Sequence, residues 1–341
     1  MSESNAFTVQ AKRNDYISFA KAFAIVTIVV YHFCMLIEMP DFLSRVAGLG
    51  GGGVHLFIFA SGFGLYLSKY STYKIFLKRR FSKVLYPYYL AVTFIFLFNY
   101  FWKIFDDDFT AYLSHIFLFK MFFEKYDTSF GGQFWFISTI IQLYLVYPLL
   151  LKLVNLLNPF LCLVGFIVIS ILYSLTISYL GYGELRVVNS FFIQYLWEFV
   201  LGMIVAKKGL IEKVISIKWY ILSIIALVAY SVMALLVQNF GSFGKNLNDL
   251  FSFIGYFSIS VIIFKVVKKS SKTFRAVIAF EKISYPLYLT HTFIFSLFFK
   301  FFFQKITLIH LPIIITISFI FAYLFSLVLN KLLVNNSAKN L

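Results

Sequence analysis

Ten long apolar stretches dominate this 341-residue chain and leave few folds open to it. Hydrophobic residues make up 61% of the sequence and charged residues only 13%. A water-soluble domain of this length needs a largely polar surface, so this balance excludes one. Each stretch is about as long as a helix that crosses a bilayer. The sequence therefore predicts an all-α, polytopic membrane protein with about ten transmembrane helices in one bundle. The stretches lie near residues 17–37, 50–68, 84–102, 133–152, 160–180, 190–206, 218–238, 250–268, 283–303 and 310–333.

The basic residues are divided unequally between the two sides of this predicted bundle. With ten spans both termini share a side, and that side holds 22 of the 30 Lys and Arg residues. The other side holds eight, balanced by nine Asp and Glu residues. By the positive-inside rule both termini are cytoplasmic. The net charge of +16 is thus a topology signal, and we expect no nucleic-acid partner. We predict a cytoplasmic segment at 1–16, a transmembrane domain at 17–333 and a cytoplasmic tail at 334–341.

The first stretch contains a pair of ionisable residues, Lys21 and His32. Lys21 and His32 are eleven residues apart, so on a helix they point in directions only about 20° apart, with a rise of ~16 Å between them. Lys21 can extend its side chain to the cytoplasmic surface, which is the alternative to a functional role. His32 lies deeper, where an ionisable group usually serves a purpose, although a neutral imidazole can also simply bond a neighbouring helix. The aligned pair is the main indication of function.

A second cluster of basic residues, 78–83, precedes the third stretch. Arg80 and Lys83 are three residues apart, so on a helix they share a face and can bind a phosphate together. Anchoring to anionic lipid headgroups explains the same charges equally well. In the second stretch, Ser61 is a small polar residue of the kind that lets helices approach closely. His55, near the outer end of that stretch and at roughly the depth of His32, is a candidate second imidazole, although an interfacial histidine is the simpler interpretation.

Later stretches add four polar or aromatic candidates. Trp135 is either an aromatic at the membrane interface or a ligand-binding side chain. Glu198 is the one carboxylate within a predicted span and needs a partner or a proton. Tyr288 and His291 are three residues apart and share a helix face. The two cysteines both lie in apolar runs, so we expect neither a disulfide framework nor a metal site.

In their order along the chain, these features resemble the acyltransferase-3 family of multipass membrane acyltransferases. The resemblance covers essentially the whole sequence. It rests on the basic residue ten positions before a histidine, on GGVHLFIFASGF, on the two basic residues of 80–83, on FWFISTIIQLYLVYPLL and on ISYPLYLTH. The first basic residue is lysine, where arginine is more frequent in the family. The soluble SGNH domain of some relatives is missing from this sequence, so we expect a stand-alone enzyme.

The resemblance implies transfer of an acyl group, usually acetyl, from cytoplasmic acyl-CoA to a hydroxyl of a surface polysaccharide or its lipid-linked precursor. It implies a bacterial plasma-membrane enzyme with no permanently bound cofactor. His32 would be the general base, while Lys21, Arg80 and Lys83 would bind the donor phosphates. The substrates would also contact other residues, with a hydroxyl or imidazole among them as oxyanion donor. These residues are Ser61, Trp135, Glu198, Tyr288 and His291.

Two other functions remain open from the residues alone. Ten spans with 21% aromatic residues are also compatible with an exporter of polysaccharide or lipid-linked sugar. A non-enzymatic membrane partner of glycan synthesis and export machinery would likewise need no catalytic motif. The sequence shows neither paired broken helices nor a series of membrane carboxylates, which transporters often have. We therefore favour the acyltransferase, with the exporter as the alternative.

Overall fold

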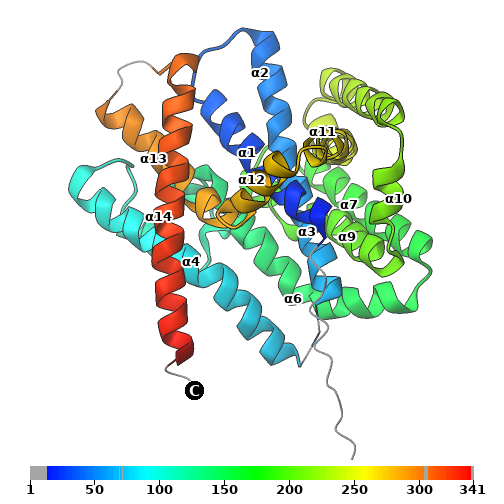
Figure 1. The fold of residues 1–341 in the computed structure, drawn as a ribbon, viewed down its shortest axis with the longest axis horizontal. Coiled ribbons are helices and arrows are strands. Elements are labelled where there is room, and N and C mark those ends of the chain that lie inside the picture. The colour runs from blue at the N-terminus through cyan, green and yellow to red at the C-terminus, as the bar shows by residue number, and fades with distance from the viewer. Residues whose placement is uncertain (1–13, 69, 71, 303–305, 339–341) are drawn as a thin grey trace, which may run out of the picture.

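The computed structural model describes residues 14–68, 70, 72–302 and 306–338. It is 85% helical, and no strand occurs in those residues, which confirms the predicted all-α class (Figure 1). The predicted segment 1–16 lies almost entirely outside the described residues, and the predicted tail 334–341 lies partly outside them. The helices are α1 (Asp15–Cys34), α2 (Asp41–Gly48), η1 (Leu49–Gly52), α3 (Gly53–Leu67), α4 (Tyr73–Trp102), α5 (Phe109–Ile116), η2 (Lys120–Phe122), η3 (Glu124–Tyr126), η4 (Gly132–Phe134), α6 (Trp135–Leu156), α7 (Pro159–Tyr179), α8 (Arg186–Asn189), η5 (Phe192–Tyr195), α9 (Leu196–Lys208), α10 (Ile211–Ser216), α11 (Trp219–Lys268), α12 (Ser271–Glu281), α13 (Ser284–Phe301), η6 (Leu308–His310) and α14 (Leu311–Ala338).

Eight helical segments among the described residues are long and apolar enough to cross a membrane. Helix α11 supplies two of them, because its backbone turns at Gly241, where φ is 52°. The other two predicted spans correspond to α9 and α13. With 13 residues, α9 is shorter than a full crossing, and α13 carries polar side chains that lower its mean hydropathy. Helix α4 begins well before the predicted third span, and Pro87, near the start of that span, lies inside the helix.

The first helix lies at the centre of the bundle and the last at its edge. Asn14 caps α1 by accepting a hydrogen bond from the Ile17 N–H at 3.1 Å. In the most apolar window of α1, 61% of the residues are buried inside the protein, against 17% for α14. Helix α1 contacts α3, α11, α12 and α13. The helix that carries the predicted base is therefore held on several sides.

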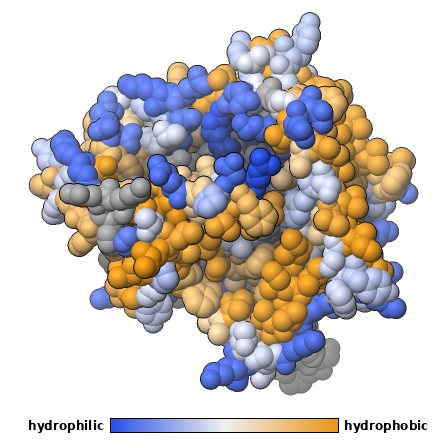
Figure 2. Space-filling model, turned by 90° about the horizontal axis from the view of Figure 1, so that it is seen from above, coloured by the Kyte–Doolittle hydropathy of each residue, from blue (hydrophilic) through white to orange (hydrophobic). Residues whose placement is uncertain are grey.

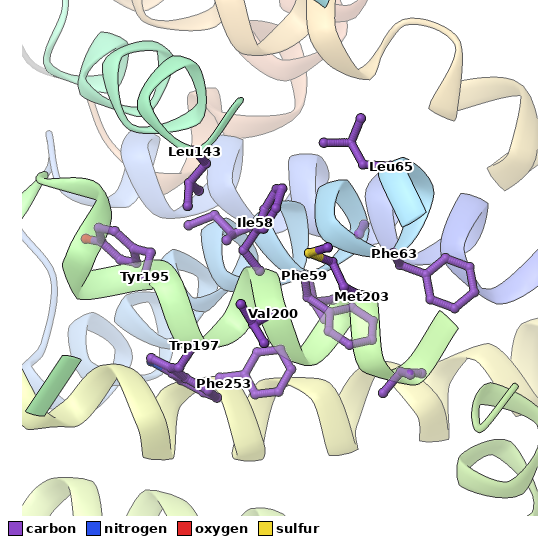
Figure 3. Close-up of a cluster of buried hydrophobic side chains, with 14 of the residues drawn as sticks. Ile58, Phe59, Phe63, Leu65, Leu143, Tyr195, Trp197, Val200, Met203 and Phe253 are labelled. Atoms are coloured by element: carbon purple, nitrogen blue, oxygen red, sulfur yellow. The ribbon is translucent and has the colours of Figure 1, made fainter. Parts of the chain in front are cut away.

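Helices α3 and α9 pack with their backbones almost in contact. A side-chain carbon at Gly62 would lie 2.0 Å from the Phe199 carbonyl oxygen, and one at Gly202 would lie 2.1 Å from the Phe59 carbonyl oxygen. Glycine is therefore required on both helices. Around this contact, large apolar side chains from α3, α6, α9 and α11 form one buried cluster (Figure 3). This packing fixes α9 beside α3.

We expect Gly202→Ala to lower the free energy of unfolding by about 1–3 kcal/mol, because the new methyl group forces α3 and α9 apart. Reversible unfolding in mixed detergent micelles measures this change. Gly165→Ala in α7 is the matched control, since nothing lies within 4 Å of the added carbon, and alanine favours a helix over glycine by about 1 kcal/mol. Equal stability of the two variants would contradict the close contact.

The segment between α4 and α6 folds as short helices joined by polar contacts. Asp108 caps α5, and its hydrogen bonds from Thr110 and Ala111 lower its pKa. The neighbouring Asp107 accepts the Phe130 N–H at 2.7 Å, although burial raises the pKa of its carboxyl group. Lys120 is buried and donates to backbone carbonyl oxygens of the following turn. These contacts hold the loop that leads into η4 and α6.

Candidate active site

A cavity at the end of the bundle predicted to face outward holds the His32 side chain. It has about 760 Å³ of empty space and is lined by residues of α1, η1, α3, η4, α6, α8, η5, α11 and α13. The polar and aromatic side chains on its wall include His32, His55, Gln133, Trp135, Arg186, Asp249 and Tyr288. Figure 2 looks at the molecule from above and shows hydrophilic residues gathered on part of this face, beside broad hydrophobic areas. We refer to this space as the outer cavity.

His32 is hydrogen-bonded to a second histidine, and their partners determine which nitrogen can act as a base. The Leu287 carbonyl oxygen only accepts, so His291 Nδ1, 2.9 Å away, must donate to it. His291 Nε2 is then an acceptor when the ring is neutral. It lies 2.8 Å from His32 Nδ1, which must therefore donate. This assignment leaves the Nε2 lone pair of His32 as the proton acceptor.

The two rings differ in exposure in the way that a base and its supporting residue should. His291 is fully buried, whereas His32 is half-buried and lines the outer cavity. The rings are nearly parallel, with an interplanar angle of 7° and centroids 5.1 Å apart. When His32 takes up a proton, His291 Nε2 accepts the Nδ1–H bond and stabilises the imidazolium. His291 is thus a positioning residue for His32.

The sequence suggested that His55 is an interfacial histidine, which is wrong. His55 belongs to a buried ion cluster. Its Nδ1 lies 2.8 Å from Glu198 Oε1 and its Nε2 lies 3.8 Å from Asp249 Oδ1. Glu198 is completely buried beside His55 and is not among the residues that line the outer cavity. Gln194 donates to the other oxygen of Asp249 at 2.9 Å. Asp249 therefore places one carboxylate at the outer cavity, next to His55.

Trp135 lies inside the bundle and not among the lipid-facing aromatics. Its ring stacks on Tyr195, with centroids 5.5 Å apart, and the exposed Arg186 guanidinium lies 4.3 Å from its centroid. All three residues line the outer cavity. Arg186 and Asp249 therefore place opposite charges at the same cavity, a combination that can bind the hydroxyls of a polar acceptor.

A second cavity, here called the inner cavity, lies toward the side predicted to be cytoplasmic and brings the basic residues together. It has about 1280 Å³ of empty space, and its lining includes Lys21, Ser61, Arg80, Lys83 and Glu281. The Lys21 ammonium lies 3.6 Å from a Glu281 carboxylate oxygen. The Arg80 guanidinium donates to the Ser68 hydroxyl at 2.9 Å. Three cations from α1 and α4 thus line one space large enough for part of a nucleotide-containing donor.

The two cavities meet at a pair of aromatic side chains. Phe57 of α3 and Phe136 of α6 line both cavities, and their ring centroids are 6.2 Å apart. Phe136 also lies edge-on to Tyr288. Hence the cavity that holds His32 and the cavity that holds the three cations share two aromatic side chains in their walls.

The predicted site residues fall into two groups. The outer cavity is lined by His32, Trp135 and Tyr288, and His291 lies directly behind His32. The inner cavity is lined by Lys21, Ser61, Arg80 and Lys83. Three further residues line these cavities and were not predicted, namely Arg186, Asp249 and Phe57. They come from α8, α11 and α3. No spacing near Arg186 or Asp249 identifies them, and Phe57 is one of several aromatics in GGVHLFIFASGF.

The protein combines a multipass helical bundle, an imidazole at one cavity and three cations at a second, an arrangement compatible with a membrane group-transfer enzyme. A family profile described as an acyltransferase domain matches residues 14–331. The chain therefore belongs to the acyltransferase-3 family and is a membrane acyltransferase. No curated protein and no solved structure matched it.

Proposed function

We propose that the protein is a membrane O-acyltransferase that takes an acetyl group from acetyl-CoA at the cytoplasmic face. The acceptor is a hydroxyl of a cell-surface polysaccharide or of its lipid-linked precursor, and the membrane is a bacterial plasma membrane. The observation that carries the proposal is the hydrogen-bond chain from Leu287 through His291 to His32, which leaves one basic nitrogen facing the outer cavity. The cation-lined inner cavity supports a polyphosphate donor.

The charges of the inner cavity support a polyphosphate donor there. Lys21, Arg80 and Lys83 line this cavity and would bind the phosphates of CoA, with the guanidinium as a forked donor. The pantetheine arm would then extend between Phe57 and Phe136, which are the side chains common to both cavities. This path brings the thioester toward His32.

The acceptor hydroxyl would enter from the outer cavity. As its oxygen attacks the thioester carbon, its proton passes to His32 Nε2 and the carbonyl electron pair moves onto the oxygen. Collapse of the tetrahedral intermediate re-forms the C=O bond and breaks the C–S bond. The departing CoA thiolate takes the proton from the His32 imidazolium, which restores the neutral base. His291 keeps the His32 ring in the required tautomer throughout.

Transfer of labelled acetyl from acetyl-CoA to de-O-acetylated surface glycan tests this function. We expect label on the glycan with membranes that contain the protein and none with membranes from a deletion strain. NMR of the surface glycan, with and without the gene, identifies the hydroxyl that carries the ester. Intracellular glycan accumulation in the deletion strain, with acetylation of the residual surface glycan unchanged, would instead favour the exporter.

We expect Arg80→Ala and Lys83→Ala to raise the KM for acetyl-CoA, each by about 10- to 100-fold, because each loses a charge-assisted contact worth about 1.5–3 kcal/mol. Initial rates at varied donor concentration measure the effect. The matched control is Arg79→Ala, since Arg79 is an exposed neighbour outside the inner cavity. An unchanged KM in both variants would assign these charges to lipid anchoring.

A further inference from the structure

Gln133 is a buried amide with no hydrogen-bond partner for either end of its side chain. It is 3% exposed, and neither Nε2 nor Oε1 has a partner among the described residues. Leaving a buried polar group unpaired costs about 1–3 kcal/mol. Gln133 lines the outer cavity together with His32 and Tyr288. An unsatisfied amide at this cavity indicates that its partner is a ligand.

The backbone around Gln133 holds this amide in place. The Tyr288 hydroxyl donates to the Gln133 carbonyl oxygen at 2.5 Å, which ties η4 to α13. Gly131 has φ of 128°, a conformation that favours glycine. A side-chain carbon at Gly131 would lie 2.3 Å from Gln133 Oε1 and 2.7 Å from Thr292 Oγ1. The amide oxygen thus lies against Gly131, close to Thr292 of α13.

The other candidate oxyanion donors are already engaged. The Tyr288 hydroxyl donates to Gln133, and His291 Nδ1 donates to Leu287. Ser61 lies in the inner cavity, 3.3 Å from the Tyr144 hydroxyl. Of the four residues Ser61, Tyr288, His291 and Gln133, only Gln133 has a side chain with no hydrogen-bond partner among the described residues.

We propose that the Gln133 side-chain N–H donates to the carbonyl oxygen of the acyl thioester and stabilises the oxyanion that forms there. This proposal rests on the proposed function. The C–O bond forms as the carbonyl π electrons move to that oxygen, and the proton of the acceptor hydroxyl goes to His32. A preorganised donor aimed at this oxygen is worth about 10²–10³-fold in kcat.

Gln133→Met keeps the length of the side chain and removes the donor, and Gln133→Glu replaces the N–H group with an acceptor. We expect both variants to lose about 10²–10³-fold in kcat while the KM for acetyl-CoA changes little. Two inhibitors separate catalysis from folding: a CoA thioether without a carbonyl group, and a trifluoromethyl ketone analogue that binds as its tetrahedral hydrate. Both variants should bind the thioether as the wild type does and bind the ketone analogue much more weakly.

The control is Gln142→Met in α6, the helix that follows η4, because Gln142 donates to Ser138 and accepts from the Phe192 N–H and does not line the outer cavity. It should leave the ratio of the two inhibitor affinities unchanged. Equal weakening of both inhibitors in Gln133→Met, or an unchanged kcat, would overturn the assignment. A wild-type protein without transfer to any hydroxyl acceptor would instead refute the proposed function itself.

Discussion

His32→Gln is expected to lower the rate of acetyl transfer by about 10²–10⁴-fold, because the variant has no side chain that can accept the proton of the acceptor hydroxyl. Glutamine can still hydrogen-bond His291, so the packing of α1 against α13 is largely preserved. Transfer of labelled acetyl in membranes gives the rate. Binding of the CoA thioether should not change, since His32 does not line the inner cavity.

His310→Gln is the control for a general effect of losing a histidine. His310 lies in η6, away from both cavities, and this substitution should leave transfer unchanged. Wild-type transfer in His32→Gln would remove His32 from the mechanism, and it would leave His291 without the supporting role assigned to it.

Glu198→Leu is expected to reduce the free energy of unfolding by about 3–5 kcal/mol, because it leaves the buried His55 without its closest charged partner. Reversible unfolding in mixed detergent micelles measures the loss. Replacing both members with leucine should recover much of it, since a buried ion pair and a packed apolar pair are often similar in stability. The double variant therefore separates loss of the pair from loss of the fold.

Glu184→Leu is the matched control for this experiment. Glu184 pairs with Lys245 at the same distance of 2.8 Å, but both side chains are about 60% exposed. An exposed pair of this kind contributes about 0–1 kcal/mol. If Glu198→Leu and Glu184→Leu were equally stable, the buried cluster would have no special structural role.

The helical class and the placement of most spans were predictable, because length and hydropathy alone decide whether a segment crosses a bilayer. The alignment of Lys21 with His32 follows from helical geometry within a single element. The pairing of His291 with His32 was not predictable, since it depends on how α13 packs against α1. Only the shared face of Tyr288 and His291 pointed to that region.

The environment of His55 could not be derived from its neighbours in sequence. Its partners, Glu198 and Asp249, lie on α9 and α11, and both helices reach it through tertiary packing. Arg186 meets Trp135 for the same reason, from a short helix between two spans. Spacing within one helix predicts which residues share a face, but contacts between helices decide what that face meets.

In the proposed mechanism, donor and acceptor reach one base from opposite sides of the membrane. Proteoliposomes with de-O-acetylated glycan trapped inside and labelled acetyl-CoA supplied only outside test this arrangement directly. We expect labelled glycan in the lumen with the wild-type protein, and a rate lower by about 10²–10⁴-fold with His32→Gln. Product that forms only when acetyl-CoA and glycan share the same side would contradict the mechanism.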